Sequence, residues 1–201
     1  MTPEIEEKLN IAGSTLLNLY STNLPYEVFP DATQFLQRLV PERQEGKLKV
    51  GTTSNYDKRI VKMVKSLDLS AYFDFITYSE ESKFCKPQKE IFEDAIRMSG
   101  LINLEANEVL HIGDDLDKDY CGARKMGWNA LLMSWDEVNT NKLLSEVNDP
   151  SSSSDIKLED ICDSFCEIVD KLFDNKWFNL YMNIITIVYW LNLIKTFDFL
   201  Q

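Results

Sequence analysis

The segment His111-Ile112-Gly113-Asp114-Asp115-Leu116-Asp117-Lys118-Asp119 is the most informative part of this chain. It follows the apolar pair Val109-Leu110 and places four carboxylates within six residues, at the end of a short apolar run. Carboxylates this close repel one another, so a cation is their natural partner, and oxygen ligands without a thiolate suit Mg²⁺ better than zinc. The alternative is a solvated acidic turn that caps the next helix.

Alternating strand and helix patterns extend outward from this segment. The apolar runs, turn residues and helix caps predict, in order, strand 47–53, helix 57–67, strand 73–78, helix 87–98, strand 108–112, helix 117–126 and strand 129–133. This alternation is typical of the α/β class and predicts a parallel sheet with right-handed crossovers. Such sheets bind ligands at the carboxyl ends of their strands, so Ser54 and the acidic residues 114–119 should share one edge.

Two further positions on this edge are candidates for binding an anion. Ser54 and Asn55 lie where the strand gives way to a helix, and a helix N-terminus offers free backbone amides to an anion. An ordinary helix cap is the alternative, because Ser and Asn are common capping residues. Lys86 precedes the helix that Pro87 opens, where its charge disfavours that helix. A carboxylate or phosphate should therefore hold Lys86, unless it is simply an exposed lysine.

The histidine and the cysteines give no sign of a metal centre. His111 lies inside its strand without partner ligands, so we interpret it as a core or edge histidine. No Cys-x-x-Cys pair occurs, which excludes a zinc framework. Cys162 and Cys166 are four residues apart on a predicted helix, and we interpret them as buried free thiols.

Composition limits the classes of protein that fit. The 201 residues suit one domain, or one domain with an appendage. A net charge of -12 argues against nucleic acid or an anionic membrane surface as the main partner, although a local cationic pocket could still bind phosphate. No apolar stretch follows Met1, so secretion is not expected and a cytoplasmic, or nuclear, location is.

The two ends of the chain lack the alternating strand and helix patterns of its middle. Residues 3–20 predict an amphipathic helix, and residues 157–173 predict a second one that covers the sheet. Residues 178–194 carry no charge, which makes them a marginal membrane span. We expect instead an extension of unknown packing, and a tail anchor is the alternative. A further alternative is that the β-branched residues 184–191 fill a vacant strand position.

Three segments together resemble motifs two, three and four of the haloacid dehalogenase (HAD) superfamily. They are Thr53-Ser54-Asn55-Tyr56-Asp57-Lys58-Arg59, Lys86-Pro87 with Ile91-Phe92, and Gly113-Asp114-Asp115 with Asp119. The resemblance covers roughly residues 1–173 and implies a Rossmann-like parallel sheet with a helical cap. It divides the chain into a remnant of the cap (1–24), an incomplete α/β core (25–173) and an apolar C-terminal extension (174–201).

The resemblance also implies roles for the site residues. Ser54, Asn55 and Lys86 would bind the phosphoryl group of a small phosphorylated molecule, and Lys86 would also balance charge during catalysis. Asp114, Asp115 and Asp119 would serve Mg²⁺, and Asp119 would also orient Lys86. The family chemistry is Mg²⁺-dependent hydrolysis of phosphate esters through an aspartyl-phosphate, for which cations and fixed donors stabilise the transferring group.

One essential part of that family pattern has no match in this sequence. The family's nucleophile and acid–base residue form an Asp-x-Asp motif after a central strand, and no such motif precedes Ser54. Asp198 does not supply it, because Leu200 follows two residues later. We therefore expect a truncated chain whose sheet lacks the strand between 47–53 and 108–112, and which is inactive as given. The alternative is a pseudoenzyme that binds phosphate, Mg²⁺ or a protein partner.

Overall fold

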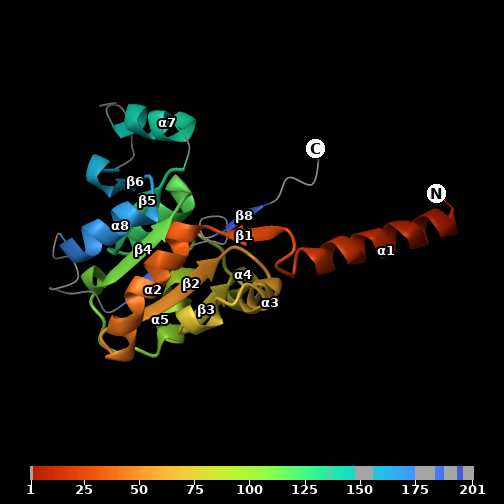
Figure 1. The fold of residues 1–201 in the computed structure, drawn as a ribbon, viewed down its shortest axis with the longest axis horizontal. Helices are drawn as coiled ribbons and strands as arrows, with labels where there is room; N and C mark the ends of the chain where they lie inside the picture. The colour runs from red at the N-terminus through yellow and green to blue at the C-terminus, as the bar shows by residue number, and fades with distance from the viewer. Residues whose placement is uncertain (1, 136, 148–155, 175–183, 188–193, 197–201) are drawn as a thin grey trace.

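The computed structural model describes residues 2–135, 137–147, 156–174, 184–187 and 194–196 (Figure 1). Its main sheet has six parallel strands in the order β3-β2-β7-β4-β5-β6. These are β3 (Phe75–Tyr78), β2 (Lys49–Ser54), β7 (Ile184–Ile187), β4 (Val109–Gly113), β5 (Asn129–Met133) and β6 (Ile161–Cys162). A separate antiparallel pair joins β1 (Tyr26–Val28) to β8 (Ile194–Thr196). The predicted α/β class with a parallel sheet is confirmed.

Helices cover both faces of this sheet, because alternate residues of each buried strand point to opposite faces. Leu110 and Ile112 of β4 pack in one apolar cluster and Val109 packs in the other. The first cluster includes residues of α2 (Pro30–Gln44), α3 (Arg59–Ser66) and α8 (Phe165–Val169). The second includes residues of α5 (Lys89–Ser99), of a π-helical segment (Leu116–Cys121) and of α6 (Gly122–Lys125). Two further helices are α4 (Ser79–Ser82) and α7 (Glu137–Val147).

The strand β7 comes near the end of the chain but lies at the centre of the sheet. Ile184 pairs with Lys49 and Val109, and Ile187 pairs with Thr52 and Ile112. The strand position expected to be vacant between β2 and β4 is therefore occupied by β7. This agrees with the alternative in which residues 184–191 form a strand there. Residues 184–187 of the predicted C-terminal extension thus pair within the main sheet, and the domain boundary at residue 174 stays a prediction.

The prediction of one amphipathic helix over residues 157–173 is wrong. A 3₁₀ turn (Leu158–Asp160), the strand β6, α8 and a π-helical segment (Asp170–Asp174) occupy this region. Ile161 and Cys162 pair with Leu132 and Met133 of β5, and this pairing outweighs local helical periodicity. Cys162 is buried as expected, but Cys166 is exposed, because the two do not share one helix face.

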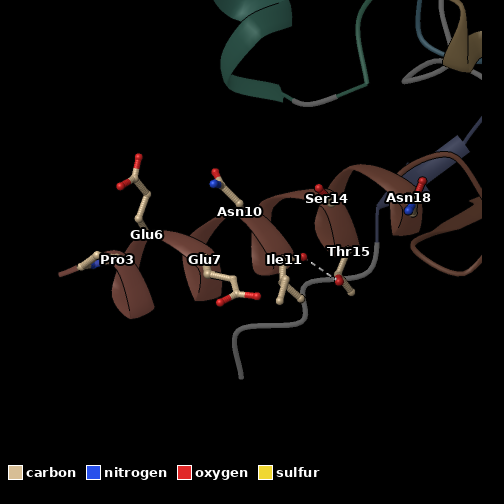
Figure 2. Close-up of a pocket in the computed structure, with 8 residues that line it drawn as sticks. All are labelled: Pro3, Glu6, Glu7, Asn10, Ile11, Ser14, Thr15 and Asn18. Carbon is tan, nitrogen blue, oxygen red and sulfur yellow. Dashed lines mark hydrogen bonds between the residues drawn. The ribbon is translucent and has the colours of Figure 1, made fainter. Parts of the chain in front are cut away.

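Helix α1 (Pro3–Leu19) projects away from the rest of the molecule and carries the N-terminus at its far end (Figure 1). It has no buried residue, and apolar side chains such as Ile5 and Leu9 are exposed. A groove of about 550 Å³ runs along it, with Glu6 and Ile11 in its wall (Figure 2). This groove contains none of the site residues predicted from the sequence, and the assignment of residues 1–24 to a cap stays a prediction.

In the part of the chain that the structure describes, no helix has both the length and the apolar character needed to cross a bilayer. Within the uncharged segment 178–194, Ile184–Ile187 form β7 and Ile194 begins β8. The remainder of that segment lies outside the described residues.

Candidate functional site

The candidate site lies at the carboxyl edge of the main sheet, where β2 and β4 end. Ser54 is the last residue of β2, and Gly113 is the last residue of β4. Both strands flank β7 in parallel, so their carboxyl ends face the same edge. Lys86 reaches this edge from the loop between α4 and α5, and its side chain contacts Thr53 of β2 and Asp119 of the π-helical segment after β4.

Lys86 is 3% exposed, and its ammonium group is held from two sides. Nζ donates a hydrogen bond to the carbonyl oxygen of Thr53 at 3.0 Å and forms an ion pair with Oδ1 of Asp119 at 2.8 Å. Burying an ammonium group without a counter-charge is costly, so Asp119 is what makes a lysine tolerable here. The expectation that an anionic group holds Lys86 is confirmed, and the alternative of an exposed lysine is wrong.

Asp119 is fixed by the loop that follows β4. Its Oδ2 accepts hydrogen bonds from the backbone amides of Asp114 at 3.2 Å and Asp115 at 3.1 Å. A Cβ on Gly113 would lie 2.5 Å from the Asp119 carboxyl group, so this close approach requires glycine. Burial opposes ionisation of Asp119, but the charge of Lys86 and the contacts with Lys86 and His111 together outweigh it and hold the pKa of Asp119 below its usual range.

The three aspartates predicted to serve Mg²⁺ do not share one role. Asp115 accepts from the backbone amide of Lys118 at 2.8 Å and from its ammonium group at 2.5 Å, as a helix-capping residue does. Asp119 is occupied by Lys86 and two backbone amides, and Asp114 is partly buried. Among the described residues no three His, Cys, Asp or Glu side chains form a group that could hold a metal. These residues do not fit a magnesium site built from protein ligands alone.

Ser54 and Asn55 use their side chains differently. The hydroxyl of Ser54 is fully buried and has no hydrogen-bond partner among the described residues. Buried hydroxyl groups are normally paired, so Ser54 Oγ has the capacity to bind a further group. The side-chain amide of Asn55 instead bonds the backbone of Lys86, through Nδ2 to the carbonyl oxygen and through Oδ1 to the amide. Sequence reasoning missed this contact and the carbonyl of Thr53, because backbone partners leave no signature in a sequence.

His111 is a core residue, as the sequence predicted. It is fully buried against the rings of Phe92 and Trp128, with ring centroids 5.3 Å and 6.3 Å away. Its Nε2 lies 3.7 Å from Oδ1 of Asp119. Burial lowers the pKa of His111 to about 4, although Asp119 opposes the shift, and the charge of Lys86 adds to it.

This burial predicts a measurable pH dependence of stability. The unfolded chain protonates its one histidine near pH 6.5, whereas folded His111 stays neutral until about pH 4. The unfolded state therefore binds one more proton between these values, so stability should fall as the pH is lowered, by roughly 3 kcal/mol in total. Urea denaturation of the native chain and of His111→Gln at pH 6.5 and 4.5 checks this. Equal pH dependence in the two chains would contradict it.

Comparison with known proteins settles the family. A family model described as haloacid dehalogenase-like hydrolase matches residues 2–127. The chain belongs to the HAD-like hydrolases. One relative, the Rhythmically expressed gene 2 protein of Drosophila melanogaster, is 35% identical over 128 residues, which cover 64% of this chain and 49% of that protein. Another, Haloacid dehalogenase-like hydrolase domain-containing protein 3 of Danio rerio, is 32% identical, with 54% and 42% covered.

Solved structures of the HAD superfamily share the fold. The putative HAD-hydrolase YfnB of Bacillus subtilis, solved bound to magnesium, aligns with a TM-score of 0.56 and 21% identity. The alignment covers 72% of this chain and 56% of YfnB. At this identity the likeness establishes the HAD-like fold and nothing finer. The chain spans about half the length of the curated relatives it matches.

Proposed function

We propose that the carboxyl-edge site is the oxyanion-binding half of a HAD-type phosphate ester hydrolase. The observation that carries this proposal is the buried ammonium group of Lys86, fixed between the end of β2 and Asp119. A cation and fixed donors at this position suit a phosphoryl group, and the buried hydroxyl of Ser54 is a further donor. Because Ser54 is fully buried, binding must include an opening of the residues around it.

We also propose that these 201 residues alone do not hydrolyse phosphate esters. In the family pattern the attacking carboxylate follows the central strand, and the central strand here is β7. No Asp or Glu occurs from residue 175 to residue 197. Without a carboxylate nucleophile the covalent route through an aspartyl-phosphate cannot start. The same observation supports the second candidate function, a non-catalytic protein that binds a small phosphorylated molecule.

Magnesium is part of this proposal only in a restricted sense. Mg²⁺ commonly uses one or two carboxylates together with water and substrate phosphate oxygens. Asp115 caps the π-helical segment and Asp119 pairs with Lys86, so both of these carboxylates already have other roles. One carboxylate falls short of a protein-built site, so we assign no chemical step to Mg²⁺ and expect millimolar Mg²⁺ alone to leave the melting temperature unchanged.

Turnover and binding measured together test this proposal. The full chain should show no hydrolysis of an aryl phosphate with Mg²⁺ present. Inorganic phosphate should still bind in calorimetry, and Ser54→Ala should weaken it by about tenfold, since a hydrogen bond to a charged group is lost. Ser70→Ala removes an exposed hydroxyl and is the matched control. Turnover that disappears in Asp114→Asn would contradict the inactivity, and equal phosphate binding in both serine variants would contradict the site.

A further inference from the structure

We propose that Asn55 is a positioning residue that holds Lys86 in the site, and that its side chain is not a ligand contact. This inference rests on the proposed function for the meaning of Lys86, but its evidence is independent of any ligand. Nδ2 of Asn55 donates to the carbonyl oxygen of Lys86 at 2.9 Å, and the amide of Lys86 donates to Oδ1 at 2.6 Å. The two residues are 31 positions apart in the sequence.

The loop that carries Lys86 explains why such a contact is needed. Lys86 lies between the end of α4 and the start of α5, in a turn outside any helix or strand. Its backbone amide and carbonyl therefore have no ladder or helix partner, and a buried backbone group without a partner is costly. Asn55 satisfies both groups with one side chain, as a neighbouring strand would.

Residues at the end of β2 thus fix Lys86 at both of its ends. Asn55 binds the backbone of Lys86, and the carbonyl of Thr53, two residues earlier, accepts from its ammonium group. A lysine side chain is long and flexible, so its charge is well placed only if both ends are held. Asp119 then adds the counter-charge from the β4 side. The position of the cation is consequently set by the end of β2.

The chemistry of the carboxamide accounts for asparagine at this position. One contact needs an acceptor and the other needs a donor, and the carboxamide carries both at the required spacing. Aspartate would keep the acceptor for the Lys86 amide but would face the Lys86 carbonyl without a donor. Alanine would provide neither group. Because both polar atoms of Asn55 bond the backbone of Lys86, we assign binding of a phosphoryl group to the Lys86 ammonium group, to Ser54 and to backbone amides.

Lysine labelling in the 201-residue chain tests the inference without any ligand. An amine-reactive anhydride, followed by mass spectrometry, reports the labelling rate of each lysine. Buried Lys86 should react slowly in the native chain, and Asn55→Ala should raise its rate by at least about tenfold. Asn55→Asp should give an intermediate rate. Asn129→Ala should leave Lys86 unchanged, because that side chain bonds the carbonyl of Asn107.

Lys171 distinguishes a local effect from general unfolding. Its ammonium group bonds the carbonyls of Glu159 and Ile161, on residues away from the site, so its rate should stay constant in every variant. An unchanged Lys86 rate in Asn55→Ala, or equal rises at Lys86 and Lys171 in both Asn55 variants, would overturn the inference. If the native chain fails to bind inorganic phosphate while Asn55→Ala still raises the labelling rate of Lys86 selectively, the proposed function is refuted and the role of Asn55 stays supported.

Discussion

Replacing Thr186 with proline should lower the free energy of unfolding by at least about 3 kcal/mol. Thr186 pairs with Gly51 of β2 and with His111 of β4, so it lies within the central strand of the sheet. Proline donates no amide hydrogen bond, and central strands do not accept it. Because small domains are stable by about 5–15 kcal/mol, this one change removes a large share of the total.

The control is Thr186→Val, which keeps the backbone amide and a β-branched side chain. Urea denaturation of both variants at pH 7 measures the difference, and hydrogen exchange at the amides of Val50 and Leu110 locates it in the neighbouring strands. Selective loss of protection at these amides is expected in the proline variant. A proline variant as stable as the valine variant would show that β7 does not complete the sheet.

Lys86→Met should destabilise the chain by about 3–5 kcal/mol. The side chains of Lys86 and Asp119 are 2% and 3% exposed, so the substitution leaves a buried carboxylate without its counter-charge. The backbone amides of Asp114 and Asp115 still bond that carboxylate, but no opposite charge then offsets its desolvation cost. Chemical denaturation at pH 7, where Asp119 of the native chain is ionised, measures the effect.

A second substitution separates lost charge pairing from lost packing. In Lys86→Met with Asp119→Asn, no unpaired charge remains, and the new carboxamide oxygen can still accept from the amides of Asp114 and Asp115. The double variant should therefore be more stable than Lys86→Met alone, a coupling that a double-mutant cycle reports. If the two single substitutions add without a coupling free energy, the ion pair between Lys86 and Asp119 does not contribute to stability as proposed.

Local patterns were sufficient to predict the alternating middle of the chain. Between residues 47 and 133 each predicted strand and helix has its own apolar run, and Gly100, with a φ of 73°, marks the end of α5. The short helix α4 was not predicted. The exception is the helix expected at 117–126, which is a π-helical segment followed by α6. The predicted α-helix is thus partly π-helical, but its place between β4 and β5 is as predicted.

Long-range pairing is what the sequence could not decide. An uncharged, β-branched run such as Ile184–Ile187 fits an extension, a membrane span or a strand equally well by local criteria. Its place between β2 and β4 depends on partners more than 70 residues away, by the register of the three strands. The two-residue strand β6 is likewise defined by β5, and no window of local sequence reveals it.

The candidate site likewise has parts that the sequence predicted and parts that it did not. The identities of Ser54, Lys86 and Asp119 are visible as motif residues, and the structure brings Lys86 to the end of β2 and to Asp119. The two hydrogen bonds from Asn55 to Lys86 could not be predicted from the sequence, because they join a side chain to the backbone of a residue 31 positions away. The capping role of Asp115 agrees with the simpler alternative for the acidic segment, a turn that begins a helix.

The most direct test of the proposed oxyanion site is a titration of the ¹⁵N-labelled full chain with inorganic phosphate, followed by NMR. We expect the largest amide shifts at Ser54, Asn55 and Asp114, at the carboxyl ends of β2 and β4. Lys62 and Lys65, exposed on α3, should shift little and serve as internal controls. Shifts confined to those surface lysines, or no shift at Ser54 at saturating phosphate, would contradict the account.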